Sequence, residues 1–347
     1  MALAMVFMGL RISSRDVPPP GIERPWNVFS NVYWPPSNQL EAAIIVGDGQ
    51  AWATIANDPT VSHPELYTGE EIELVYRGQR PLIGWVVAIL SAGQPGAVPY
   101  ALAACTVASI GLLVVAAMYL ASRLGRDPSR AWAVALMPGA MLSVVLLAPD
   151  PLPVALAVLG LYWWLGGTPR DRALAVVALV GAALGRELLV LVPVVLALHQ
   201  LLIARLRLRE ILPLAAPVVA VAAWIGSLRV RYGIWPTAAD QLERVGPPFS
   251  GWARALDHIE PLAWFSYVLG AVLLFLAFRR DARSPLTWIA ASFALLTIVI
   301  GENVLSTEPY RPLLCLWVLS VIVILPAARK ERSVRARPSV ADVPSGA

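Results

Sequence analysis

The chain has 347 residues, of which 58% are hydrophobic and 14% charged, and its mean hydropathy is +0.66. A soluble globular chain is about 25% charged, so an ordinary soluble enzyme is excluded. Both cysteines, Cys105 and Cys315, lie inside apolar runs, which excludes a disulfide framework and a cysteine metal site. We expect a lipid bilayer, and no nucleic acid, among the partners of such a chain.

The N-terminal segment, residues 1–10, is apolar but has about half of the roughly 20 residues that a bilayer crossing needs. It lacks the features of a signal peptide, so we predict a partial or truncated first transmembrane helix. Residues 11–96 follow as a long loop. Within this loop, Arg80-Pro81 opens an apolar run that is too short to cross, which predicts an interfacial half-helix.

Residues 97–327 contain the apolar runs that predict membrane crossings. The clear runs are 97–121, 131–148, 211–228, 262–278 and 312–327, and the weaker ones are 150–166 and 285–300. The stretch 173–204 would be about 48 Å long as one helix, so it should fold back on itself. We predict a hairpin with Gly185-Arg186-Glu187 at its apex. The result is an all-α transmembrane bundle of about nine crossings.

Basic residues gather at one side of this bundle, where five segments hold 16 of the 27 basic residues and 6 of the 23 acidic ones. These segments are 122–130, 167–172, 205–210, 279–284 and 328–347. The positive-inside rule makes them cytoplasmic, and the last is expected to be a disordered basic tail. Both long loops, 11–96 and 229–261, then lie on the external side.

Asp48 is expected to open a short helix whose apolar face includes Trp52. One interpretation is that Asp48 caps this helix by accepting backbone N–H bonds. The other is an acidic residue held at the membrane surface as a general base or a metal ligand. The same choice arises for Asp150, which either caps a helix that starts at Pro151 or faces the same external cavity as Asp48.

Arg77 and Arg80 would lie at the level of the lipid headgroups, where they either anchor the loop or bind a ligand. Arg186 and Glu187 are an intramembrane ionisable pair, which indicates a functional site unless the two charges neutralise each other at the hairpin apex. In the functional interpretation, Arg186 contacts an anionic group and Glu187 orients it or a partner helix. Arg311 opens the last span from outside, where it either binds a phosphate or extends to the interface.

The second long loop is rich in arginine, aromatic residues and proline between Arg229 and Trp252. This composition predicts an interfacial lid, and aromatic anchoring at the membrane surface explains it equally. The histidines, His63, His199 and His258, are dispersed along the chain, so we expect no zinc triad.

Four features follow one another along the chain: GDGQAWATIA with Asp48, YRGQRPL before a short helix, Asp150 after two further spans, and GREL before an apolar run. This pattern resembles the GT-C superfamily of polytopic membrane glycosyltransferases, which use polyprenyl-phosphate sugars as donors. Bacterial members carry an aromatic residue, usually Tyr, four residues after the first Asp, and Trp52 holds that place here. The resemblance covers residues 40–325.

The resemblance implies a GT-C-like fold and hexosyl transfer, as by a mannosyltransferase, at the external face of a bacterial inner membrane. The partners would be a polyprenyl-phosphate sugar donor and a lipid or glycan acceptor of the cell envelope. Asp48 would be the catalytic base or would contact a divalent cation, and Arg186, Arg311 and Arg80 would hold the donor phosphate. With the interpretations above, the expected substrate-binding residues are Arg77, Arg80, Asp150, Arg186, Glu187 and Arg311.

Two other classes of protein fit the residues. Broken hairpins and intramembrane charges also mark translocation pathways, so a transporter or flippase of a lipid-linked substrate is one alternative, although the sequence has no internal repeat. The other is a noncatalytic membrane scaffold that partners a cell-envelope enzyme, which the short length and the lack of a second acidic ligand would favour. The enzyme hypothesis requires Asp48 and Arg186 to meet in space.

Overall fold

The computed structural model of the chain describes residues 2–19, 21–25, 28–45, 47–67, 71–236, 247–307 and 309–328. Every regular element within these ranges is a helix, accompanied by two isolated β-bridges. The expected all-α class is therefore confirmed for the described part of the chain.

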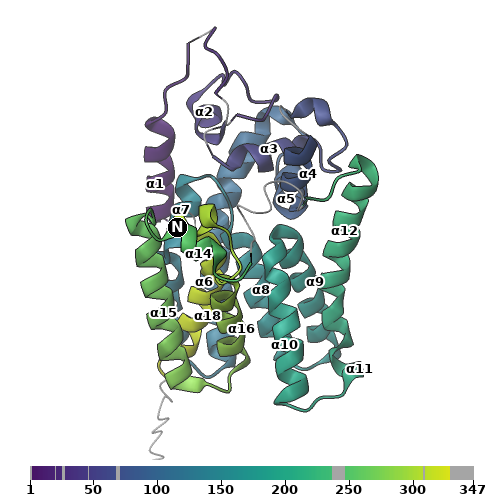
Figure 1. The fold of residues 1–347 in the computed structure, drawn as a ribbon, viewed down its shortest axis with the longest axis vertical. Coiled ribbons are helices and arrows are strands. Elements are labelled where there is room, and N and C mark those ends of the chain that lie inside the picture. The colour runs from purple at the N-terminus through teal and green to yellow at the C-terminus, as the bar shows by residue number, and fades with distance from the viewer. Residues whose placement is uncertain are drawn as a thin grey trace, which may run out of the picture.

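The molecule has two layers, with short helices at one end and a bundle of longer helices below them (Figure 1). The short helices come from residues 2–90. They are α1 Ala2–Ser13, α2 Gln39–Ile45, α3 Gly49–Asn57, η1 Pro64–Leu66, α4 Glu71–Gly78 and α5 Pro81–Leu90. Helix α5 starts where the half-helix is predicted, because proline suits the first helical position, at which the N–H needs no helical partner.

The short helices have a core of their own, in which α3 packs on α5. Trp52, Ile55 and Ile83 are at most 3% exposed in this core. Gly84 permits the close packing, since a Cβ atom at this position would lie 2.3 Å from Cγ2 of Ile55. Burial of Trp52 agrees with the apolar face predicted for α3, and the packing fixes the start of that helix, next to Asp48.

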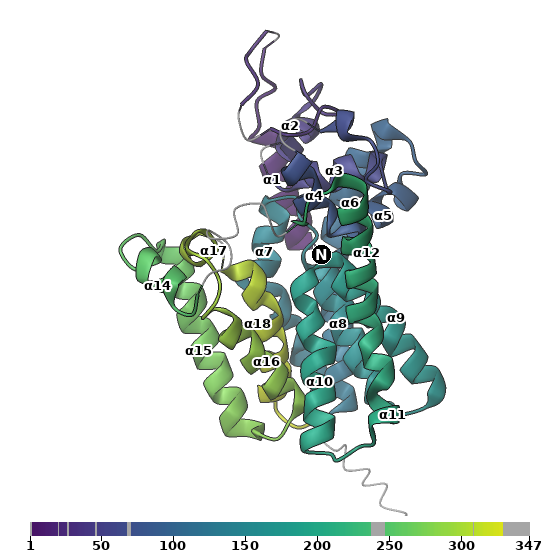
Figure 2. The ribbon, with the colours of Figure 1, turned by 45° about the vertical axis from the view of Figure 1, so that its right-hand side comes forward.

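The bundle extends from α6 to α18, and Figure 2 separates its last helices, α14 to α18, from α8 to α12. Its elements are η2 Pro95–Ala97, α6 Val98–Arg123, η3 Pro128–Leu136, α7 Pro138–Val145, α8 Pro151–Trp164, α9 Pro169–Gly185, η4 Glu187–Val190, α10 Leu191–Leu202, α11 Leu208–Ile211, η5 Leu212–Ala215, α12 Ala216–Tyr232, α14 Ser250–Ala255, α15 Pro261–Asp281, α16 Pro285–Leu296, α17 Glu302–Ser306 and α18 Tyr310–Ile324. Helix α18 is buried along almost its whole length, against α15 and α16.

Within the described part of the chain, three helical stretches are long and apolar enough to cross a membrane, as judged by length and composition. They are Pro95–Arg123, Leu208–Tyr232 and Pro261–Asp281, with 29, 25 and 21 residues. Other predicted crossings correspond to shorter helices, such as the 14 residues of α8. A helix of that length extends about 21 Å, less than the roughly 30 Å of a hydrocarbon core, so the nine crossings stay a prediction.

The helix breaks in one predicted crossing and at the apex of the predicted hairpin. The run 131–148 is divided, because η3 ends at Leu136 and α7 begins at Pro138, whose ring and missing N–H prevent one continuous helix. The stretch 173–204 is divided at Arg186, as the predicted hairpin requires. Its legs pack mainly on other helices, with α9 on α8 and α12, and α10 on α16.

The bundle end away from α2 to α5 carries α11 and the α15–α16 connection, which belong to the predicted basic segments (Figure 1). The chain after α6 joins the end of α18 there, through backbone hydrogen bonds from Asp127 N to Pro326 O and from Ala328 N to Gly125 O, both 2.9 Å. The predicted tail, 328–347, lies outside the described residues apart from Ala328.

Candidate functional site

The structure brings the seven predicted site residues together at the boundary between the two layers. Five of them form one series of ion pairs and the other two form a separate pair beside it, and we call these seven residues the network. They are Asp48, Arg77, Arg80, Asp150, Arg186, Glu187 and Arg311. The first three belong to the short helices and the other four to the bundle. Asp48 and Arg186, which the enzyme hypothesis requires to meet, are linked through Arg311 and Asp150.

Close packing of the Gly-Asp-Gly turn brings Asp48 to the bundle. Cβ atoms at Gly47 and Gly49 would each lie 3.1 Å from a backbone carbonyl oxygen, that of Leu146 and that of Leu147 respectively. Glycine at both positions therefore lets the turn approach the α7–α8 connection. The second aspartate of the network lies in that same connection.

The Asp48 carboxylate is bound by two arginines. Its Oδ1 accepts a hydrogen bond from Nη1 of Arg77 at 3.3 Å, and its Oδ2 accepts one from Nη1 of Arg311. The side chain is 30% exposed, the largest fraction in the network. Asp48 occupies the N-cap position of α3, but within the described structure its side chain makes no capping bond. The capping interpretation of Asp48 is therefore wrong.

Asp150 is the buried counterpart of Asp48. Its Oδ1 accepts a hydrogen bond from Nη1 of Arg186 at 2.9 Å, and its Oδ2 accepts one from Nε of Arg311 at 2.8 Å. The side chain is 6% exposed. Pro151 does start α8, yet in the described part of the chain Asp150 makes no side-chain capping bond. This capping interpretation is wrong too, because two guanidinium groups occupy the carboxylate oxygens.

Glu187 pairs with Arg80, and not with its neighbour Arg186. Nε and Nη2 of Arg80 donate to the two carboxylate oxygens of Glu187 at 2.6 and 2.7 Å, which makes a bidentate pair. The backbone at Arg186 is extended, with φ −155° and ψ 113°, so adjacent side chains point in opposite directions. The alternative interpretation, in which Arg186 and Glu187 neutralise each other at the hairpin apex, is therefore wrong. Glu187 instead links the apex to the start of α5.

Arg186 ends the network on the bundle side. Its side chain is 11% exposed, and its buried Nε has no hydrogen-bond partner among the described residues. A buried donor without an acceptor costs about 1–3 kcal/mol, and more when the group is charged. An oxygen atom of an anionic ligand at this position would remove that cost.

Charges alternate along the network, from Arg77 through Asp48, Arg311 and Asp150 to Arg186. Burial by itself raises the pKa of the Asp48 carboxyl, but the charges of Arg311 and Arg77 outweigh this effect and hold the pKa well below its usual range. Asp48 is therefore ionised at neutral pH. The series begins and ends with arginine, an arrangement that attracts anionic groups.

Two aromatic residues that contact arginines of the network were not predicted. Cζ of Arg77 lies 4.0 Å from the ring centroid of Phe29, and Cζ of Arg80 lies 5.2 Å from that of Tyr76. Such cation–π contacts cover one face of each guanidinium group. Tyr76 could have been found from its i, i+4 spacing to Arg80, whereas Phe29 lies in a segment without a motif.

The divalent cation expected at Asp48 does not fit this arrangement. The groups bound to the Asp48 carboxylate are guanidinium groups, which repel a cation. Among the described residues, no three His, Cys, Asp or Glu side chains come together. His63 and His258 pair with Glu65 and Glu302 respectively, each at 2.8 Å. We therefore derive no chemistry through a metal.

Two further predicted features were the aromatic residue after Asp48 and the interfacial lid. Trp52 is 3% exposed and belongs to the core of the short helices. Of the predicted lid, 229–252, residues 237–246 lie outside the described part of the chain. Next to them, Cζ of Arg229 lies 5.7 Å from the ring centroid of Trp235.

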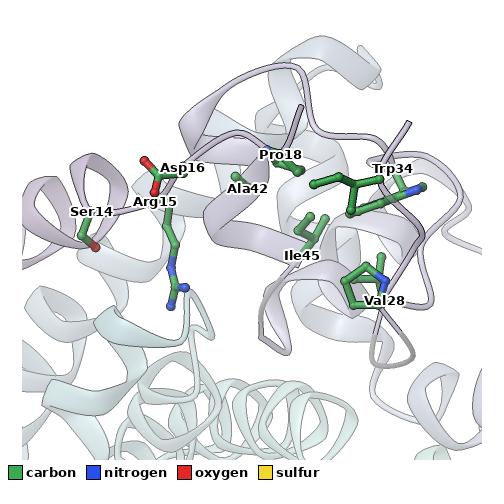
Figure 3. A pocket seen from close by; sticks show the side chains of 10 residues that line it. Ser14, Arg15, Asp16, Pro18, Val28, Trp34, Ala42 and Ile45 are labelled. Carbon is green, nitrogen blue, oxygen red and sulfur yellow. The ribbon is translucent and has the colours of Figure 1, made fainter. Parts of the chain in front are cut away.

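A cavity of about 330 Å³ opens among the short helices (Figure 3). Its lining includes Arg15 and Asp16 after α1, Ala42 and Ile45 of α2, and Trp34 between these helices. The seven network residues are not part of the described lining. The predicted site residues therefore lie in the network and not in this cavity.

A scan of the chain against protein-family models found no match, and a search against curated proteins found none either. The functional conclusion therefore depends on the network itself.

Proposed function

We propose that this protein is a GT-C-type membrane glycosyltransferase. It would transfer a hexose from a polyprenyl-phosphate donor to a cell-envelope lipid or glycan at the external face of a bacterial inner membrane. The observation that carries the proposal is the linkage of Asp48, on the short helices, to Arg186 and Arg311 of the bundle. This linkage gives one site a carboxylate and several phosphate-binding groups.

The arginines suit the leaving group. In the transfer, the bond between the anomeric carbon and the phosphate oxygen breaks, and the phosphate leaves with the electron pair. Planar guanidinium groups bind phosphate oxygens in bidentate fashion and stabilise the developing charge. Arg311 and Arg77 offer Nη1 atoms beside Asp48, and the buried Nε of Arg186 has no acceptor among the described residues.

Asp48 suits the role of the base that takes the proton from the acceptor hydroxyl as its oxygen bonds to the anomeric carbon. A carboxylate with a lowered pKa is a weak base. A donor phosphate would compete for the guanidinium groups of Arg77 and Arg311 and leave Asp48 with fewer positive contacts. Donor binding would therefore raise the basicity of Asp48 before the proton transfer.

The two layers suit the two substrates. The three apolar stretches are long enough to lie in a bilayer, where a polyprenyl chain also lies. Asp48 is at the more exposed end of the network, 30% against 6% for Asp150, so a polar acceptor would reach it from the short-helix side. The donor phosphate would lie between this end and Arg186.

The test is transfer of labelled hexose from polyprenyl-phosphate donors by the full-length protein in lipid. We expect Asp48→Asn, which removes the carboxylate charge at nearly constant volume, to lower the transfer rate at least about 100-fold. Asp257→Asn is the matched control, because Asp257 is exposed and lies outside the network. No transfer by folded wild-type protein across hexosyl donors, or full activity of Asp48→Asn, would overturn the proposal.

The interrupted hairpin favours one rival function. The chain breaks at Arg186 between α9 and α10, and charged residues at broken helices also occur along translocation pathways. A flippase would move a fluorescent polyprenyl phosphate between the leaflets of vesicles without transferring sugar. Such movement by wild-type protein that lacks transfer activity would favour the flippase.

A further inference from the structure

Helix α12 contacts the short helices through hydrogen-bond donors on one of its faces. Nε1 of Trp224 donates a hydrogen bond to the carbonyl oxygen of Gly78 at 2.8 Å. Two turns further along α12, Nη1 of Arg231 and the hydroxyl of Tyr232 both donate to the carbonyl oxygen of Val61, at 2.7 and 2.6 Å. The spacing i, i+7, i+8 places these three side chains on the same side of the helix.

The carbonyl that Trp224 binds lies in the turn that carries two arginines of the network. Helix α4 ends at Gly78, between Arg77 and Arg80. The turn is tightly packed, since a Cβ atom at Gly78 would lie 2.9 Å from Cγ1 of Val61. The two carbonyls bound by α12 therefore belong to segments in direct contact.

The Trp224 ring is itself held in place. It packs edge-to-face on Trp85 of α5, with ring centroids 5.3 Å apart and planes at 83°. Nε1 of Trp85 donates to the carbonyl oxygen of Pro59 at 2.6 Å. Trp224 can thus fix the position of Gly78 with its N–H group, while its ring packing provides a separate contribution to stability.

We propose that Trp224 is a positioning residue, which sets the turn 77–80 so that Arg77 and Arg80 are aligned for the donor phosphate. This inference rests on the proposed function. The hydrogen bond from Arg77 to Asp48 is 3.3 Å long, beyond the usual upper limit of about 3.2 Å, so a small shift of the turn would break it. Catalytic sites are sensitive to displacements of about 1 Å.

Trp224→Phe is the informative variant, because it keeps an aromatic ring and removes the N–H donor. Trp288→Phe is its matched control, since Nε1 of Trp288 donates to a backbone carbonyl, that of Ala282, at 3.0 Å at the other end of the bundle. In full-length protein in lipid nanodiscs, we expect Trp224→Phe to speed amide hydrogen exchange over residues 74–82 about three- to tenfold. Unchanged exchange in Trp224→Phe, or an equal increase in the control, would overturn the inference.

Undecaprenyl phosphate is the probe for the consequence at the site. We expect Trp224→Phe to raise the Kd for undecaprenyl phosphate about three- to tenfold. The donor KM should rise by a similar factor, while kcat stays within about twofold of the wild-type value. The control should match wild type in all three values. Faster exchange with an unchanged Kd and KM would overturn the positioning role.

A different result would identify failure of the proposed function. If folded wild-type protein binds no undecaprenyl phosphate and transfers no sugar, the glycosyltransferase proposal fails, and the positioning role for a phosphate fails with it. The exchange measurement still reports whether Trp224 fixes the turn, so the two failures are distinguishable.

Discussion

Asp48 and Asp150 bind the same arginine, yet they lie in different surroundings. Both precede a helix and both leave that helix uncapped within the described structure. The Asp150 side chain is 6% exposed and receives hydrogen bonds on both oxygens at 2.8 and 2.9 Å, whereas the Asp48 side chain is 30% exposed with one of its bonds at 3.3 Å. The difference indicates that Asp150 serves as a buried counter-ion and that Asp48 is the more accessible of the two carboxylates.

The largest expected effect comes from Asp150→Ala. The change leaves Arg186 and Arg311 facing each other in the bundle without their shared carboxylate, and loss of one partner of a buried ion pair costs about 3–5 kcal/mol. We expect the free energy of unfolding to fall by that amount in denaturant titrations in detergent. Asp257→Ala is the control for loss of an exposed aspartate outside the network. Wild-type stability of Asp150→Ala would contradict the assignment as a buried counter-ion.

A smaller effect on stability is expected from Asp48→Asn. Its carboxylate is partly exposed and the amide can still accept hydrogen bonds, so the free energy of unfolding should fall by about 1 kcal/mol or less. The same denaturant titration measures this loss of free energy of unfolding, and Asp150→Asn, measured beside it, should lose more free energy of unfolding. Equal losses in the two variants would remove the distinction between the exposed and the buried aspartate.

The pH dependence sharpens the same comparison. Because the folded-state pKa of Asp48 lies below its ordinary value of 3.8, the charged carboxylate stabilises the fold above that value, and the contribution is lost as the pH falls through the folded pKa. We expect the Tm difference between wild type and Asp48→Asn to stay constant from about pH 7 to pH 5 and to shrink below about pH 4. A difference that grows on acidification would contradict the ion pairs of Asp48.

The smallest expected effect is that of Arg77→Lys. A lysine keeps the charge but loses the planar group over Phe29, and the pair with Asp48 is long, so stability should change by about 0.5 kcal/mol. Donor KM should rise about threefold, because the lysine cannot bind phosphate in bidentate fashion. Arg24→Lys, among the same short helices but outside the network, should leave KM unchanged. A Tm loss as large as that of Asp150→Ala would show that Arg77 is structural.

Much of the fold and of the site could be predicted, namely those features that a local sequence pattern determines. Hydropathy predicted the long apolar stretches, proline marked the start of α5 and α8, and the cost of an intramembrane charge singled out Arg186. The partners of these charges could not be predicted this way. Glu187 bonds to Arg80, 107 positions earlier, and not to its chain neighbour.

The amino-acid sequence by itself determined the helical class, the apolar stretches and the set of charged residues. Each of these depends on the length of an apolar run or on a charge within it, and both can be found in the sequence without knowledge of distant contacts. Tertiary structure decided which charges pair. Packing of the glycine turn at Asp48 against the α7–α8 connection and the extended backbone at Arg186 bring Arg311 between two aspartates. Pairing depends on contacts between segments as much as 263 residues apart, and no local pattern encodes their distance in space.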